Sequence, residues 1–169
     1  METHRLLLRP LALEDSEAIQ DIFPKWEIVQ FLLSGVPWPY PEDGARAYIR
    51  DVALPGVERG EEWAWTIRLR SNPNTIIGAI SLFAKENENR GYWLDLQYHR
   101  MGIMLEASEA TNSFWFDTLG YPVLRELKAA ANVASVRLSA RQQMTLVWEG
   151  ERDFVSGRLP AQIWERAIS

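Results

Sequence analysis

The sequence predicts an α/β domain in which a mixed sheet is flanked by helices. Segments with the two-residue periodicity of strands alternate along the chain with segments of helical spacing. Residues that interrupt regular structure, such as Pro10, Gly102 and Gly120, stand between these segments. At 169 residues with 47% hydrophobic content, the chain is long enough for a single domain, residues 1–169, with a full core.

The first half of the chain predicts both helices and a hairpin. Acidic side chains in the first turn of the segment 14–23 match the positive end of a helix dipole. The helix expected at 42–52 has one apolar side, formed by Ala45, Tyr48, Ile49 and Val52. The predicted elements are a strand at 6–9, a helix at 14–23, a helical turn at 29–33, a helix at 42–52, and paired strands at 62–69 and 76–83.

The second half predicts a strand, a loop and a long helix, followed by further strands around one more helix. The long helix ends at Gly120, a residue type that favours helix C-termini. Three consecutive aromatic residues near its end, 114–116, suggest that one of them points away from the core, toward a second subunit of a homodimer. The predicted elements are a strand at 92–98, a helix at 103–120, a strand at 123–130, a helix at 133–143, and two strands around residues 156–157.

Composition excludes several function classes. The absence of cysteine rules out disulfides, thiolate catalysis and cysteine-bound zinc, and two histidines are too few for a histidine-rich metal site. No apolar run approaches the ~20 residues that cross a bilayer, and the first residues lack a signal-peptide pattern, so we expect a cytoplasmic protein without membrane contact. A net charge of -5 argues against nucleic-acid binding and favours a cationic partner such as an amine or basic peptide.

The segment 90–120 carries the clearest chemical signal. Tyr92 and Leu94 alternate with Trp93 and Asp95, as in a strand, and a basic loop with Gly102 then leads into the helix. Unpaired N–H groups and the positive end of the dipole favour an anion at a helix N-terminus. A strand, a glycine loop and a helix start in this order predict a site for a diphosphate.

Residues 90–107 resemble the acyl-CoA signature of the GNAT N-acetyltransferases, Arg/Gln-x-x-Gly-x-Gly/Ala, and the branch they most resemble is that of the ribosomal-protein N-terminal acetyltransferases, the RimJ/RimL type. Five segments follow that family's order: residues 3–10, 63–67, 76–80, 91–94 and 132–135. The resemblance implies a GNAT fold with a mostly antiparallel sheet. It also implies transfer of an acetyl group from acetyl-CoA to a primary amine, a protein N-terminus or a small amine, by direct attack in a ternary complex.

The resemblance also implies where the cofactor binds. In this family a V-shaped gap separates the fourth and fifth strands, here 94–97 and 127–131, and pantetheine lies in it like a short strand while the following loop holds the diphosphate. The implied cofactor-binding residues are Leu94, Leu96, His99, Arg100, Met101, Gly102, Ile103, Met104, Leu105, Asn132 and Ser135. No metal is implied.

This chain departs from the family pattern inside the diphosphate loop. His99 replaces the leading Arg/Gln, Arg100 replaces a small residue, and Met104 replaces the final Gly/Ala. A glycine-containing turn that the family has after the helix following Asn132 reads Arg-Gln-Gln-Met here, at residues 141–144. These departures motivate an alternative function, a non-catalytic acyl-CoA binder or regulatory protein derived from the same fold.

Candidate catalytic residues divide into a proton donor and a base. Asn132 followed by Ser135 is a common helix-capping arrangement, and the resemblance adds a cofactor contact for the asparagine and a proton-donor role toward the CoA thiolate for the serine. Glu106 matches a family glutamate that supports the helix but is also a candidate base, as are Glu149 and Glu151 near the last strands.

A proline-rich segment, 36–41, displays Trp38 and Tyr40 and is expected to border the acceptor site, because the family places the loop between its first two helices there. A stiff connector whose aromatic side chains cover the core is the alternative reading of this segment.

Overall fold

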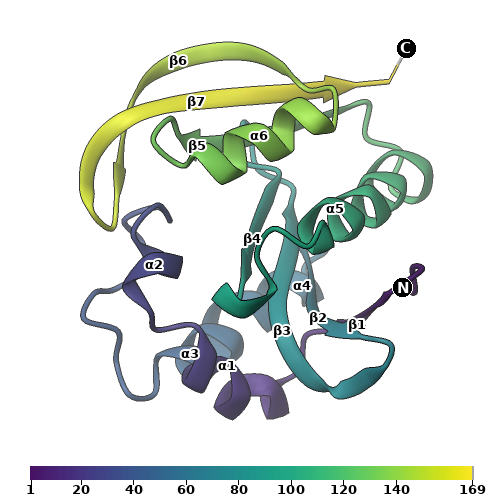
Figure 1. The fold of residues 1–169 in the computed structure, drawn as a ribbon, viewed down its shortest axis with the longest axis vertical. Coiled ribbons are helices and arrows are strands. Elements are labelled where there is room, and N and C mark those ends of the chain that lie inside the picture. Colours follow the sequence, from purple (N-terminus) through teal and green to yellow (C-terminus); the bar gives the residue numbers. More distant parts are fainter. Residues whose placement is uncertain (169) are drawn as a thin grey trace.

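Two antiparallel sheets form the centre of the computed structural model, which describes residues 1–168 (Figure 1). The first sheet has four strands in the order β1-β2-β3-β4: β1 (Leu6–Pro10), β2 (Glu62–Leu69), β3 (Asn72–Phe83) and β4 (Arg90–Leu94). The second has three strands in the order β5-β7-β6: β5 (Val123–Ala129), β6 (Thr145–Phe154) and β7 (Gly157–Ala167). The predicted α/β class is confirmed, with the sheet divided between β4 and β5.

Helices connect and cover the two sheets. Between β1 and β2 the chain forms α1 (Ser16–Ile22), α2 (Trp26–Val29), α3 (Gly44–Tyr48) and α4 (Leu54–Glu58). The helix α5 (Ile103–Ser113) joins β4 to β5, and α6 (Val133–Arg141) joins β5 to β6. Short 3-10 turns occupy Leu13–Asp15 and Leu96–Tyr98, and π-helical turns occupy Ile49–Ala53 and Phe114–Thr118. In Figure 1 the long β6–β7 hairpin curves over α6, while α1 and α3 lie at the opposite end of the molecule.

The strand predicted at 92–98 is wrong beyond Leu94. Asp95 leaves the strand and accepts hydrogen bonds from Lys25 Nζ, at 2.9 Å, and from Gln97 Nε2, at 2.7 Å. A 3-10 turn over Leu96–Tyr98 follows. The Asp95 N–H still donates to the Ile77 carbonyl of β3, so the ladder ends at this residue, where the side-chain bonds hold the start of the 3-10 turn.

The helical prediction for the first half needs two corrections. The turn expected at 29–33 lies earlier, as α2, and the helix expected at 42–52 continues through a π-helical turn into α4. Ala45 and Ile49 are buried as predicted, but Tyr48 and Val52 are 45% and 52% exposed. Val52 lies inside the π turn, which holds more residues per turn than an α-helix and so rotates its side chain away from the core. Tyr48 lies before that turn, at the end of α3.

A second π-helical turn explains the three aromatic residues after α5. Trp115 is 1% exposed and Phe116 7% exposed, and the ring of Phe114 packs edge-on against Trp65 with the centroids 5.1 Å apart. All three side chains therefore contact the core cluster. The prediction that one of them points toward another subunit is wrong, because the π turn at Phe114–Thr118 rotates less from one residue to the next than an α-helix, so more consecutive side chains face inward.

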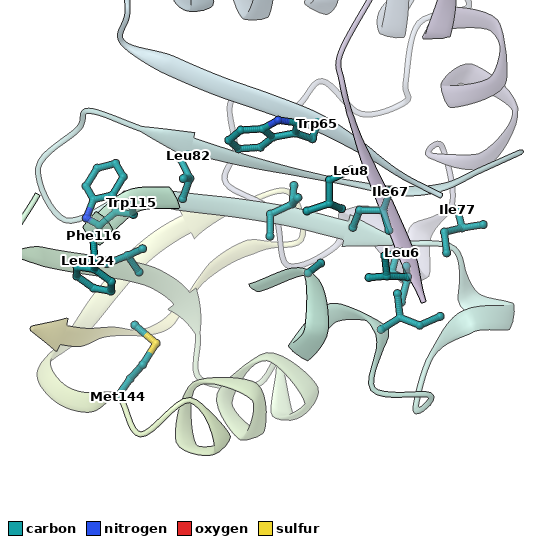
Figure 2. Close-up of a cluster of buried hydrophobic side chains, with 14 residues drawn as sticks. Leu6, Leu8, Trp65, Ile67, Ile77, Leu82, Trp115, Phe116, Leu124 and Met144 are labelled. Carbon is teal, nitrogen blue, oxygen red and sulfur yellow. The ribbon is translucent and has the colours of Figure 1, made fainter. Parts of the chain in front are cut away.

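The main core lies between the first sheet and α5 and extends into the second sheet. Figure 2 shows Leu6, Leu8 and Ile67 near one end of this cluster, with Leu124 of β5 and Met144, which precedes β6, at the other. A second cluster, which includes Ile19, Val29 and Ile49, covers the opposite face of the first sheet, while Ile76 reaches it from β3. Among residues 1–168, no helix is long and apolar enough to span a membrane.

Candidate functional site

The two sheets meet at one end of β4 and then separate. The backbone N–H of Asn89 donates to the carbonyl of Arg125 at 2.8 Å, and the N–H of Arg125 donates to the side-chain oxygen of Asn89 at 2.7 Å. One residue further along each strand, Arg90 and Glu126 are joined only by an ion pair of their side chains. Beyond these, β4 pairs with β3 and β5 pairs with β7, so the gap between β4 and β5 opens toward the C-terminal end of β4.

No strand of residues 1–168 pairs with the edge of β4 that faces this gap. Asn89 and Asp95 bond to β3 through Phe83 N–H and Ile77 C=O, so the odd-numbered residues of β4 face β3. In an antiparallel ladder the intervening residues then point the opposite way, which directs the backbone groups of Tyr92 and Leu94 toward β5. This free strand edge fits an extended amide-containing ligand, as the sequence predicted for Leu94. Leu96 lies in the 3-10 turn instead.

The loop that follows β4 turns sharply into α5. Arg100 and Gly102 both adopt left-handed backbone conformations, with φ of 63° and 74°. Gly102 is the N-cap of α5, and among the described residues no side chain caps this helix. The amides of Ile103, Met104 and Leu105 therefore remain available to an anion at the positive end of the helix dipole. This geometry agrees with the predicted diphosphate loop.

His99 and Arg100, two loop residues that depart from the family pattern, differ in their surroundings. The His99 ring nitrogen Nε2 lies 2.9 Å from the carbonyl oxygen of Leu94, so the histidine closes the loop onto the end of β4. Arg100 is exposed, as is Met101 at 52%. The left-handed conformation of Arg100 costs energy that a glycine would avoid.

Glu106 is held by the N-terminal segment of the chain. Its carboxylate accepts hydrogen bonds from the Thr3 hydroxyl, the Arg5 backbone N–H at 2.7 Å and the Arg5 Nε at 2.7 Å. Burial would raise the pKa of Glu106, but the Thr3 and Arg5 hydrogen bonds outweigh it and leave the pKa below its ordinary value. Arg5 also donates from Nη1 to the Met101 carbonyl at 2.9 Å. Glu106 and Arg5 thus fix the loop between β4 and α5 to the segment that precedes β1.

Ser135 is held at three of its atoms on the first turn of α6. Its N–H donates to the Asn132 side-chain oxygen at 3.2 Å, which confirms the predicted cap. Its carbonyl accepts from Lys128 Nζ at 3.2 Å. Its hydroxyl lies 2.7 Å from the hydroxyl of Tyr92 on β4. The serine hydroxyl therefore reaches across the gap between the two sheets.

A buried ionic network lies behind Ser135. Arg90 is fully buried and pairs with Glu126, which is 1% exposed, while Lys128 Nζ donates to the other Glu126 oxygen at 2.6 Å. Burial would raise the pKa of Glu126, but the charges of Arg90 and Lys128 hold that pKa well below its ordinary value. Further donors and acceptors come from α5 and α6, at Ser108, Asn112, Ser139 and Gln142. The network joins both sheets and both helices that border the gap.

On the other face, the segment from Lys25 to Ser34 connects the two sheets. Lys25 pairs with Asp95 at the end of β4, whose pKa lies below its ordinary value because the hydrogen bonds from Lys25 and Gln97 outweigh the effect of burial. At its other end, the backbone of Leu32 and Ser34 bonds to the β6–β7 hairpin, at Val155 and Asp153. The segment therefore borders the gap on this face.

The two predicted acceptor residues differ in their surroundings. Trp38 is 41% exposed and lies beside Trp26 on α2, with the ring centroids 5.6 Å apart. Tyr40 instead packs edge-on against Phe23, at 5.1 Å between centroids, and its ring covers Gly44, where a Cβ would come within 2.7 Å. Trp38 is thus available to a ligand, whereas Tyr40 covers the core, the alternative that the sequence left open.

The remaining candidate bases lie on the β6–β7 hairpin. Glu151 is exposed and shares Arg158 with Asp153, at an Oε2–Nε distance of 3.3 Å. Glu149 accepts a hydrogen bond from Gln162 at 3.1 Å. Neither contacts Ser135 within the described part of the chain.

Sequence reasoning missed two features of this site. Tyr92 was assigned only to the strand pattern, although its alternation with Arg90 and Leu94 places its side chain on the face toward α6. Gln143 adopts a left-handed conformation, with φ of 57°, in the turn where the family has glycine. The turn is therefore retained without the glycine.

Comparisons with known proteins agree with this geometry. The family described as Acetyltransferase (GNAT) domain matches residues 5–145. No curated protein matches the chain in sequence. A solved RimL structure, a ribosomal L7/L12 α-N-protein acetyltransferase in complex with coenzyme A, is 20% identical with a TM-score of 0.84, over 98% of this chain and 96% of that one.

Two further solved structures share the fold. A ribosomal-protein-S5-alanine acetyltransferase from Vibrio fischeri is 14% identical with a TM-score of 0.82, over 99% of this chain and 95% of that one. The microcin C7 self-immunity acetyltransferase MccE, solved with acetyl-CoA and AMP, is 15% identical with a TM-score of 0.82, over 98% of this chain and 94% of that one.

Proposed function

Because this chain belongs to the GNAT acetyltransferase family, we propose that it transfers an acetyl group from acetyl-CoA to a primary amine in the gap between β4 and β5. The observation that carries the location is the conjunction of an unpaired β4 edge with an uncapped α5 N-terminus. The amides of pantetheine can hydrogen-bond to the free edge of β4, and a diphosphate can bind the amides at the N-terminus of α5. The similar RimL and MccE structures, which contain coenzyme A and acetyl-CoA, support the same ligand.

The proposed chemistry is a direct transfer within a ternary complex. The neutral amine nitrogen attacks the thioester carbonyl carbon, a nitrogen–carbon bond forms, and the carbon–sulfur bond breaks. The electron pair of that bond leaves with the sulfur, which takes a proton from the Ser135 hydroxyl. Asn132 orders the helix turn that carries Ser135. A proton donor at this position contributes roughly 100-fold or more to such a reaction.

The acceptor nitrogen must lose a proton during the same reaction. Glu106 is engaged by Thr3 and Arg5, so we assign it to the support of the diphosphate loop. Glu151 is exposed on the hairpin that the Lys25–Ser34 segment contacts, and it is the carboxylate that we propose to receive this proton, directly or through water. A terminal amine with a pKa near ~8 is partly neutral at pH 8, so the base is expected to contribute modestly.

We place the acceptor entrance beside the exposed Trp26–Trp38 pair. The ribosomal-protein acetyltransferases among the similar structures support a protein N-terminus as the acceptor, and the acidic net charge of the chain supports a basic peptide or small amine. We propose a cytoplasmic protein without nucleic-acid or membrane partners.

Release of free CoA thiol tests this function. Purified protein is incubated with acetyl-CoA and a panel of peptides with free N-termini, alongside polyamines, and the same peptides with blocked N-termini serve as controls. We expect thiol release and a mass increase of one acetyl group in at least one amine. Binding of acetyl-CoA without any acetylated amine would favour the non-catalytic acyl-CoA binder instead.

A further inference from the structure

The hydroxyl of Tyr92 joins β4 to the first turn of α6 across the gap. Its oxygen lies 2.7 Å from Ser135 Oγ, and Ser135 is 9% exposed. The Ser135 N–H and carbonyl are both bonded to other groups, Asn132 and Lys128. The orientation of the serine hydroxyl proton is therefore decided by its contact with Tyr92.

We propose that Tyr92 is a positioning residue that directs the Ser135 hydroxyl proton toward the departing sulfur, an inference that rests on the proposed acetyl transfer. A phenol is a stronger acid than an aliphatic alcohol, so Tyr92 is the better donor in this pair. When Tyr92 donates to Ser135 Oγ, the serine proton points elsewhere, into the gap. A hydrogen bond received by the serine oxygen also polarises its own O–H bond.

The proton balance of the step involves no further reactant. The Ser135 O–H bond breaks as an S–H bond forms on the thiolate of CoA. The acceptor nitrogen releases one proton to Glu151, directly or through water, and one proton from solvent replaces the proton that Ser135 gave to the sulfur. Tyr92 keeps its own proton throughout and contributes by orienting the serine.

The buried network behind Ser135 makes this contact rigid. Lys128 bonds to the Ser135 carbonyl and to Glu126, and Glu126 pairs with Arg90, which lies two residues before Tyr92 on β4. Tyr92 and Ser135 are thus connected twice, directly through their hydroxyls and indirectly through Arg90, Glu126 and Lys128. The second connection fixes the distance across the gap, so removing the Tyr92 hydroxyl leaves the backbone positions in place.

A double-mutant cycle tests the proposal, with Tyr92→Phe, Ser135→Ala and the double variant assayed for acetyl transfer. We expect Tyr92→Phe to lower kcat roughly fivefold to tenfold, as loss of one hydrogen bond predicts, with KM for acetyl-CoA within about twofold of wild type. In the Ser135→Ala background the same substitution should change kcat by less than about twofold, because Tyr92 acts through Ser135.

Tyr121→Phe is the matched control, since Tyr121 stacks on Trp115 before the start of β5, at the opposite end of that strand from α6. It should leave kcat unchanged, and thermal melts of all variants exclude loss of folding. Equal losses of kcat from Tyr92→Phe in both backgrounds, or an unchanged kcat, would overturn the positioning role while leaving the acetyltransferase assignment intact. A wild-type protein that binds acetyl-CoA without transferring it would overturn both.

Discussion

The carboxyl group of Glu62 is buried at the start of β2, on the face of the first sheet that α3 and α4 cover. It is 5% exposed, and its Oε1 has no hydrogen-bond partner among the described residues. Gly56 of α4 lies directly above it, where a Cβ would come within 3.0 Å of Oε2. Burial raises the pKa of Glu62 to about 7, although Lys85 and Ser81 partly oppose this effect.

This pKa makes the stability of the fold depend on pH. The folded state binds a proton on Glu62 more tightly than the unfolded state does. The contribution of protonated Glu62 to folding stability is therefore fully present below the unfolded-state pKa of about 4.5 and is lost as the pH rises through the folded-state pKa of about 7. We predict that Glu62→Gln, which mimics the protonated form, is more stable than wild type at pH 8, by up to roughly 3 kcal/mol.

Urea unfolding of wild type and Glu62→Gln at pH 5 and pH 8 measures this difference, which should be small at the lower pH. Glu61→Gln, at a 60% exposed neighbouring side chain, is the control and should show little difference at either pH. A stability difference that is the same at both pH values would show that Glu62 does not titrate in this range.

At the scale of elements, the loop between β4 and α5 is the part whose backbone shape matters most for function. Gly102 has φ of 74° and forms the N-cap of α5, so any side chain there is strained and stands beside the amides proposed to bind the diphosphate. Arg5 Nη2 would lie 3.5 Å from a Cβ at this position.

We predict that CoA raises the melting temperature of wild type and that Gly102→Val abolishes most of this rise, because a ligand stabilises a protein only as far as it binds the folded state. Gly120→Val is a matched control, since Gly120 has the same φ of 74° but lies in open space after α5. That variant should lose intrinsic stability and keep the CoA-dependent shift. Equal CoA shifts in wild type and Gly102→Val would place the diphosphate elsewhere.

Elements whose pattern is local were predicted well from the sequence. The bounds of β2 were found, and those of β1, β5 and α6 lie within two residues of the prediction, because apolar periodicity and capping residues such as Asn132 decide them. The misplaced end of β4 depends on Lys25, a residue distant in sequence that bonds to Asp95. Both π-helical turns were missed, since a pattern with 3.6-residue spacing gives no signal for them.

The parts of the candidate site that depend on local sequence were predicted, and the parts that depend on contacts between distant residues were not. The glycine loop before α5 and the Asn132–Ser135 cap are local motifs, and the structure confirms the helix start at Ile103 and the cap. The contact between Tyr92 and Ser135, and the network of Arg90, Glu126 and Lys128, join residues from opposite sheets. Such contacts appear only when the fold brings these strands and helices together.

At the scale of the whole molecule, the buried network joins the two sheets beside the point where β4 and β5 separate. Arg90 and Lys128 are 0% and 5% exposed at the side chain, and both pair with Glu126. Replacing one member of a buried ion pair leaves its partner charged and desolvated, which costs about 3–5 kcal/mol. The network therefore connects stability directly to the geometry of the site.

We predict that Glu126→Gln lowers the free energy of unfolding by about 3–5 kcal/mol near neutral pH. The folded-state pKa of Glu126 is depressed, so its stabilising effect is present above the unfolded-state pKa of about 4.5 and is lost as the pH falls further. Denaturant unfolding should therefore show a smaller difference in free energy of unfolding between wild type and Glu126→Gln in acid than at neutral pH. Glu165→Gln, which breaks a partly exposed pair with Arg125, should cost far less, and equal costs for both variants would contradict a special role for the network.

A crystal structure of the protein with acetyl-CoA tests the location of the site most directly. We expect the diphosphate at the amides of residues 103–105, pantetheine along the free edge of β4, and the thioester sulfur within about 4 Å of Ser135 Oγ, close enough for proton transfer. A cofactor bound on the other face of the first sheet, or a sulfur atom remote from Ser135, would contradict this location.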